Sequence, residues 1–154
     1  MEKPRNIFQR LNAVMKDVSF VSKGDKTVNG QYTFVSHDAV TAAVRKPMVE
    51  HGVVYFPTNL AYVVNGNRVE VSIDLRFVNI DEPLDYVDIP TLGFGIDPQD
   101  KGPGKALSYA VKYGLLKALG LETGDDPEKD LIPHVPGPPA DRPKKKWEVV
   151  AKPE

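Results

Sequence analysis

A row of lysines with tyrosines beside it is the feature of this chain best suited to chemistry. Residues 98–119 carry four lysines against one aspartate. At helical spacing, Lys101, Lys105 and Lys112 share one face, with Tyr109 next to them. Tyr113 and Lys117 lie at the margin of this row. Ammonium groups beside aromatic rings can bind the phosphates and stack on the bases of a single-stranded nucleic acid, although an ordinary solvated helix face has the same pattern.

The loop before these lysines contains glycines, yet it matches no motif that activates a phosphate. A P-loop needs a glycine where Gln99 stands and a serine or threonine where Ala106 stands. Gly93-Phe94-Gly95 begins a dinucleotide fingerprint, but Pro98 occupies the place of its third glycine. Glycines and a lysine at a helix N-terminus still suit a backbone phosphate, because free N–H groups and the helix dipole favour an anion.

The carboxylates and histidines of the chain give little support for catalysis. Five acidic residues could bind Mg²⁺, or could form a solvated edge that discourages strand pairing. They are Asp81, Glu82, Asp85, Asp88 and Asp97. A metal-dependent nuclease would need carboxylates such as Asp74, Asp97 and Glu122, which share no recognised spacing. The three histidines are scattered along the chain. We therefore expect no catalytic residue, no metal site and no cofactor.

The elements that position the lysines form a sheet followed by a helix. Between residues 68 and 77 apolar and polar side chains alternate strictly, which predicts a strand with one buried and one wet face. Residues 53–64 and 84–94 predict strands on either side of it, the first interrupted at Pro57 and the second broken at Pro90. We expect an antiparallel three-stranded meander whose apolar face the lysine-bearing helix covers.

The N-terminal part predicts two further helices and a hairpin. Residues 6–16 have apolar side chains at helical spacing, and Asn29-Gly30 marks a hairpin turn within residues 20–35. Ser36 suits the N-cap of a helix that ends at Gly52, and Pro47 would either kink this helix or shift its apparent start. On that helix Arg45 and Lys46 point away from the apolar stripe. They add to the basic surface only if the fold brings them near the lysine row.

Composition predicts one folded domain and a tail. The 154 residues include 14 prolines, several of them in PHVPGPPADRPKKK near the C-terminus, so we expect a domain over residues 1–125 and a flexible tail over 126–154. Trp147 and the valines after it form either a frayed end or a docking motif. The chain has no cysteine, no apolar run long enough to span a membrane and no export signal, which favours the cytoplasm.

Three stretches resemble the ERF family of phage single-strand annealing proteins, within the wider Rad52-like group. The first is NIFQRLNAVMKDV, and the second is YTFVSHDAVTAAVRKPMVEHGV. The third and most specific is GIDPQDKGPGKALSYAVKYGLLKALGLETGD. With the strands between them, the resemblance covers roughly residues 5–125.

The resemblance implies an α+β fold with a β-β-β-α core and a function in recombination. Members of the group form rings or helical arcs, bind single-stranded DNA along a positive groove and pair complementary strands without ATP. Lys112 matches a basic helix residue that lines this groove, whereas Tyr113 stands where the group often has a second basic residue. For a phage-encoded protein the compartment would be the bacterial cytoplasm. A host single-strand-binding protein or an exonuclease could bind the tail.

The alternative is a non-catalytic protein-interaction module whose lysines are solvated and whose C-terminal tail recruits a partner. On the residues alone, Lys101, Lys105 and Lys112 fit either function. The resemblance favours DNA.

Overall fold

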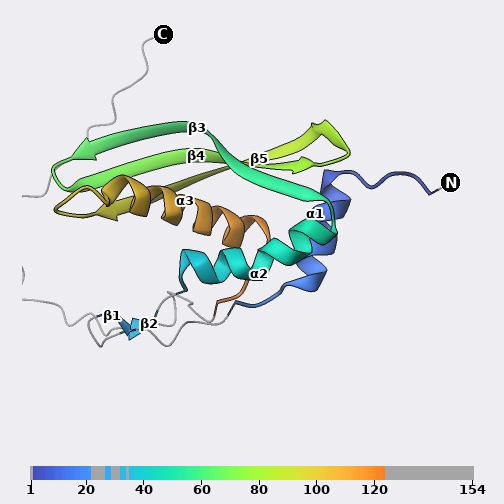
Figure 1. Cartoon of the computed structure of the whole chain (residues 1–154), viewed down its shortest axis with the longest axis horizontal. Helices are drawn as coiled ribbons and strands as arrows, with labels where there is room; N and C mark the ends of the chain where they lie inside the picture. Colours follow the sequence, from blue (N-terminus) through green and yellow to red (C-terminus); the bar gives the residue numbers. More distant parts are fainter. Residues whose placement is uncertain (1, 22–26, 29–31, 34, 124–154) are drawn as a thin grey trace, which may run out of the picture.

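The chain folds as a three-stranded antiparallel sheet packed against a long helix, with further helices at one end (Figure 1). This computed structural model describes residues 2–21, 27–28, 32–33 and 35–123. The expected α+β fold is confirmed. The elements are α1 (Ile7–Asp17), β1 (Thr27–Val28), β2 (Tyr32–Thr33), α2 (His37–Glu50), β3 (Val53–Asn65), β4 (Arg68–Asn79), β5 (Glu82–Ile96) and α3 (Gly102–Ala118).

The central strand β4 carries the core of the sheet. The sheet order is β3-β4-β5, and both pairings are antiparallel. The alternation expected from the sequence is confirmed, since one face of β4 is buried throughout. Its residues are Val69, Val71, Ile73, Leu75 and Phe77. This face packs against α3, with Ala106 and Ala110 fully buried between helix and sheet.

Two glycines of β5 let α3 approach the sheet unusually closely. A Cβ atom at Gly93 would collide with the backbone oxygen of Ala106 and lie 2.5 Å from the nitrogen of Ala110. A Cβ atom at Gly95 would meet the backbone of Gly102 and Ala106 in the same way. These glycines therefore seat a helix backbone directly on a strand, which explains the Gly-Phe-Gly sequence without any nucleotide.

Each outer strand of the sheet contains a proline. Pro57 lies in β3 just before a bulge between Thr58 and Ala61, as expected from the sequence. The expected break at Pro90 is wrong, because β5 runs unbroken from Glu82 to Ile96 and pairs Pro90 with Asp74. An edge strand tolerates proline where the missing N–H would face away from the neighbouring strand.

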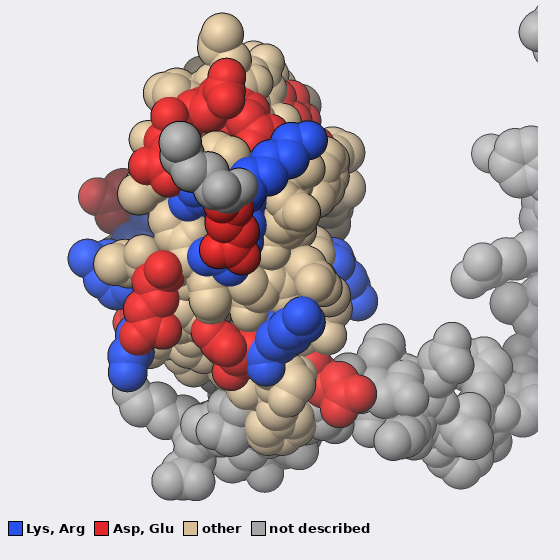
Figure 2. Space-filling model, turned by 90° about the vertical axis from the view of Figure 1, so that its right-hand side faces the viewer, with Lys and Arg blue, Asp and Glu red and all other residues tan. Residues whose placement is uncertain are grey.

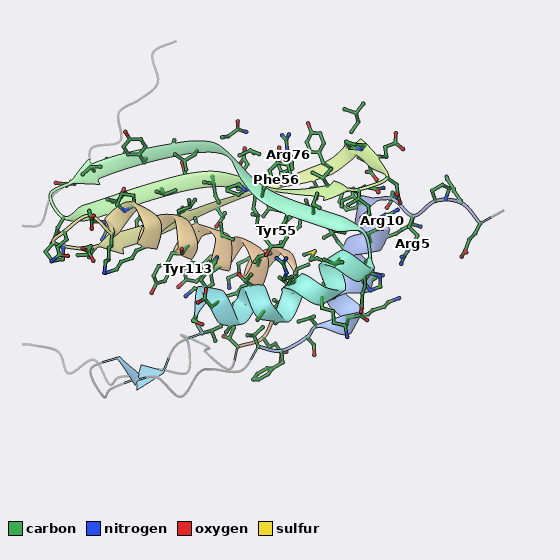
Figure 3. The ribbon with its side chains drawn as sticks, viewed as in Figure 1. Arg5, Arg10, Tyr55, Phe56, Arg76 and Tyr113 are labelled. Carbon is green, nitrogen blue, oxygen red and sulfur yellow. The ribbon has the colours of Figure 1, made fainter. Side chains whose placement is uncertain are left out.

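The outer face of the sheet is less polar than the alternation in β4 suggests. Charged and polar residues do face outward from β4, but both edge strands add exposed apolar side chains to the same face. These are Val54, Phe56, Val63, Tyr86, Leu92, Phe94 and Ile96. Figure 3 shows Phe56 and Arg76 on this outer side and Tyr55 on the helix side. The expectation of one wet face therefore holds for β4 alone.

The helix α3 also covers less of the inner face than expected. It packs mainly against β5 and β4, so the end of β3 stays exposed on both sides, with Tyr62 and Val64 among the exposed residues. The exposed apolar side chains of the edge strands, on the outer face and at this end of β3, are therefore features that the alternation alone did not predict.

The helices α1 and α2 close the other end of the sheet. Ser36 caps α2 as expected and accepts a bond from the backbone N–H of Ala39, and Asn6 caps α1 in the same way by accepting from the backbone N–H of Gln9. The helix α2 continues through Pro47, and Gly52 adopts a φ of 68° after it. Arg10 of α1 donates to the carbonyl oxygens of Arg5, His51 and Gly52, and to Asp81 at 2.6 Å (Figure 3).

Two predicted regions lie partly or wholly outside the described residues. The hairpin is confirmed by the antiparallel pairing of β1 with β2, whereas its turn at residues 29–31 is not described. The proposed tail, residues 126–154 with Trp147, also lies outside the described part. Among the described helices none is long and apolar enough to cross a membrane.

We predict that Gly93→Ala lowers the free energy of unfolding by about 3 kcal/mol, because the new methyl group meets helix backbone that cannot rotate away. Urea denaturation measures this loss. The matched control is Gly104→Ala, where a Cβ meets nothing within 4 Å. It should leave stability unchanged or raise it by up to ~1 kcal/mol. Equal stability of the two variants would contradict the close contact.

Candidate nucleic-acid interface

A groove of about 470 Å³ runs along the N-terminal half of α3 and reaches the start of α2. Its lining brings together most of the residues singled out in the sequence. They are Lys101, Lys105, Tyr109 and Lys112, with His37, Asp100, Gly104 and Ser108 between them. The spacing of the lysines thus predicted a shared surface correctly, and the sequence missed only the part that α2 contributes.

The N-terminus of α3 forms one end of this groove. Lys101 occupies the N-cap position without a side-chain cap, and Pro103 stands in the first turn, where its missing N–H costs nothing. Glycines at positions 102 and 104 keep the first turn free of bulky side chains. The helix dipole and the exposed Lys101 ammonium group both favour an anion here.

Lys105 is held by an internal carboxylate. Its Nζ atom donates to Asp97 Oδ2 at 2.7 Å and to the carbonyl oxygen of Ile96 at 3.4 Å. The bond from Lys105, with backbone N–H bonds from Gln99 and Lys101, lowers the pKa of Asp97 below its ordinary value. Asp97 is therefore a carboxylate at neutral pH. It pairs with the Lys105 ammonium group, which could otherwise bind a phosphate.

Lys112 is buried, which corrects its expected place on an exposed ridge. Only 7 % of the residue is exposed, and its Nζ atom donates to the carbonyl oxygen of Val35 at 3.1 Å. The helical spacing placed Lys112 opposite the sheet correctly, but the segment leading into α2 covers that side of α3. Lys112 forms the floor of the groove and joins α3 to the start of α2.

Two tyrosines flank this buried ammonium group. The Tyr109 and Tyr113 rings lie 5.8 Å apart at 28°. The Nζ atom of Lys112 lies 4.2 Å from the centre of the Tyr109 ring and 5.1 Å from that of Tyr113. Both rings remain about two-fifths exposed, so each presents an edge or face to solvent while its other side holds the cation.

The remaining basic residues of the predicted set lie outside the groove lining. Arg45 and Lys46 are exposed on α2, and Lys46 pairs with Glu50 of its own helix at 3.7 Å. Lys117 is exposed in the last turn of α3, away from the first turns that line the groove. The fold therefore does not gather all eight candidate residues into one surface.

The acidic residues considered for a metal are bound to different partners. Asp81 pairs with Arg10, and Asp88 accepts two bonds from Arg76, which lowers the pKa of Asp88. Asp85 accepts from the backbone N–H of Ile7 and from Asn79. Figure 2 shows acidic side chains gathered at the end of the molecule where α1 and the β4–β5 turn lie. Within the described ranges no three His, Cys, Asp or Glu residues form a group that could hold a metal ion.

His37 is the groove residue that sequence reasoning missed. It is the first residue of α2, directly after the Ser36 cap, and its ring lies 3.3 Å from Asp38. The cap signal located the start of this helix, but nothing in the sequence indicates that α2 begins beside α3. Taken together, the groove offers two exposed ammonium groups, an aromatic edge and a helix N-terminus, which suit a phosphodiester chain with unpaired bases.

Comparison with known proteins gives a family match over nearly the whole chain. A family model described as the ERF superfamily matches residues 7–147. The match spans all helices and strands from α1 to α3, and so includes the groove. It confirms the resemblance seen in the three sequence stretches. No curated protein matches the chain.

We predict that Lys112→Ala lowers the free energy of unfolding by about 2 kcal/mol, because it leaves the buried carbonyl group of Val35 without its ammonium donor. Chemical denaturation measures the loss. Lys101→Ala, a matched removal of an exposed lysine, should change stability by less than ~0.5 kcal/mol. Two equally stable variants would show that Lys112 does not anchor α2.

Proposed function

Because the chain belongs to the ERF superfamily, we propose that it binds single-stranded DNA and anneals complementary strands without ATP in phage-type recombination, as an oligomeric ring or helical arc. The observation that carries this proposal is the groove along α3, in which Lys101, Lys105 and Tyr109 lie together. The proposal places the protein in the cytoplasm of a bacterial host and confines the annealing domain to residues 1–125.

Electrostatics support a strand bound through its backbone. Lys101 and Lys105 are exposed and lie on successive turns at the N-terminal end of α3. Each can neutralise a phosphate, which is the sequence-independent part of nucleic-acid binding. The exposed part of Tyr109 lies beside them and offers a surface on which a base can stack, worth ~1–3 kcal/mol per base.

Annealing needs presentation of the bases and no bond-making step. A strand held through its phosphates keeps its Watson–Crick edges free to meet a second strand. The proposed activity therefore requires no nucleophile, metal or cofactor, and we propose that the protein is not an enzyme.

One groove with two exposed lysines gives weak binding. Repeating it around an assembly makes each further contact intramolecular, and this raises the overall affinity without any new kind of contact. Self-assembly is thus part of the proposed function. In the same proposal, Lys112 acts by holding the floor of the groove rather than by touching DNA.

We predict that the double variant Lys101→Ala/Lys105→Ala binds an oligothymidylate at least about tenfold more weakly. Loss of two phosphate contacts should also reduce the slope of log affinity against log salt concentration by about 1.4. Fluorescence anisotropy at several salt concentrations measures both quantities.

The matched control is Arg45→Ala/Lys46→Ala, which removes the same charge from exposed positions on α2 outside the groove. It should retain the affinity and salt slope of the natural chain. Equal losses in the two double variants would place the DNA elsewhere. Absence of DNA binding and of ATP-independent annealing in the unaltered chain would instead favour the protein-interaction module, with partners recruited through residues 126–154.

We predict that Asp97→Asn tightens oligonucleotide binding, because it frees Lys105 from its carboxylate and keeps the Oδ1 acceptor that caps Gln99. The lowered pKa of Asp97 gives the pH dependence. At a pH above the pKa of Asp97, this residue is ionised in the natural chain, which therefore binds the oligonucleotide more weakly than the variant does. As the pH falls through this pKa, the Asp97 carboxylate of the natural chain is protonated and the difference in affinity between the two chains disappears. Weaker binding by the variant at neutral pH would contradict a role for Lys105.

A further inference from the structure

The second half of β3 is exposed to an unusual degree for a strand in a sheet. Residues 60–65, with the sequence LAYVVN, are all exposed, and Tyr62 is 67 % exposed. The strand pairs only with β4, so the backbone groups along its other side meet no described strand. The segment has no charged residue and no proline. An apolar edge of this kind is a template for association with another chain.

The opposite edge of the sheet carries a second apolar surface at the same end of the strands. Leu92, Phe94 and Ile96 of β5 are exposed on the outer face. The register across β4 connects Val63 with Glu70 and Glu70 with Phe94, so the two edges lie directly across the sheet from each other. Figure 1 shows β3 and β5 as the two margins of this end, with β4 between them. Residues 91–96 also contain neither charge nor proline.

The prolines and charged residues that can block strand association at the edges β3 and β5 all lie toward the other end of the sheet. Pro57 in β3 and Pro90 in β5 both precede the exposed segments. The charged residues of β5, Glu82, Asp85 and Asp88, all lie in its first half. Prolines and charges at sheet edges commonly prevent association. Their absence from the last part of both edges leaves two unprotected apolar surfaces on opposite sides of one molecule.

We propose that residues 60–65 of one copy contact residues 91–96 of the next, in a head-to-tail assembly of this chain. The inference deepens the proposed function, because it names the surface through which the annealing protein would form its ring or arc. Two different surfaces that fit each other produce a heterologous contact, and repetition of such a contact closes a ring or continues as a helix.

A second copy is the occupant that accounts for both surfaces at once. Neither segment carries a charge, and Arg68, whose guanidinium carbon lies 4.4 Å from the centre of the Phe94 ring, is paired with Glu70, so the contact desolvates no unpaired ionic group. Four apolar side chains on β3 are each more than half exposed: Leu60, Tyr62, Val63 and Val64. They offer on the order of 400 Å² together, about half of the ~800 Å² per partner in a stable interface, before the strand backbone and flanking residues are added. A foreign partner on one edge would leave the other unexplained.

The β5 edge also borders the groove. Lys105 donates to the carbonyl oxygen of Ile96, and the Tyr109 side chain lies within contact distance of the position a Cβ atom would take at Gly93. A copy seated on β5 therefore lies next to the groove of its neighbour. Repetition of the contact would then place each groove beside the next copy of the chain.

The test uses one charge on each edge of the full-length chain. Tyr62→Glu should block the β3 edge, and Phe94→Glu should block the β5 edge. Leu84→Glu is the matched control, because Leu84 is an 88 % exposed apolar residue at the other end of β5. We expect assemblies from the natural chain and the control, and monomers from each edge variant, when mass is measured by light scattering without DNA. Circular dichroism checks that all variants remain folded.

Mixing the two edge variants identifies the kind of contact. Each retains one working edge, so an equimolar mixture should form a dimer and stop there. A monomeric natural chain, assembly by either folded edge variant, or a mixture that stays monomeric would overturn the proposal. Loss of assembly in the control would do the same, because it would place the contact outside the two edges.

A separate measurement distinguishes this proposal from the proposed function. The edge variants keep Lys101 and Lys105, so they should bind a short oligothymidylate with the weak affinity of one groove. The groove variant Lys101→Ala/Lys105→Ala should assemble normally. Assembly without DNA binding contradicts the proposed function alone. DNA binding by a natural chain that assembles, but whose folded edge variants assemble as well, contradicts the head-to-tail contact alone.

Discussion

The direct contact between the backbone of α3 and the strand β5 is the constraint on which the rest of the structure depends. Gly93 and Gly95 leave no room for a side chain beneath Gly102, Ala106 and Ala110. A helix seated this closely cannot roll without clashing, so its remaining faces are fixed as well. Lys105 and Tyr109 consequently project beside the edge of β5, where they reach Ile96 and the groove.

A buried cation holds the second wall of the groove. Lys112 spans from α3 to the carbonyl oxygen of Val35, directly before the cap of α2, while two tyrosine rings lie against its ammonium group. A buried charge is costly unless its donors are satisfied. The bond to Val35 offsets part of that cost, and it ties the position of His37 and the start of α2 to the helix that carries the exposed lysines.

Local patterns in the sequence predicted the elements well, because each pattern depends on a few neighbouring residues. The alternation of Val69 to Phe77, the Ser36 cap and the positive φ of Gly52 all follow from short-range sterics and hydrogen bonding. Features that depend on distant segments were predicted poorly. Spacing could not show that the chain before α2 covers Lys112, that β5 continues through Pro90 without a break, or that α3 leaves the end of β3 uncovered.

The guanidinium group of Arg10 joins parts of the chain that are made at different times. It bonds to carbonyl groups next to β3 and to Asp81, which lies 71 residues further along the chain. During translation α1 therefore leaves the ribosome well before its docking partners exist. Its apolar face, with Ile7 and Val14, belongs to a core cluster that also contains residues of α2, β4 and α3, so this face has no complete core until α3 has been made. Until then, the nascent chain carries an amphipathic helix whose apolar face has nothing to pack against.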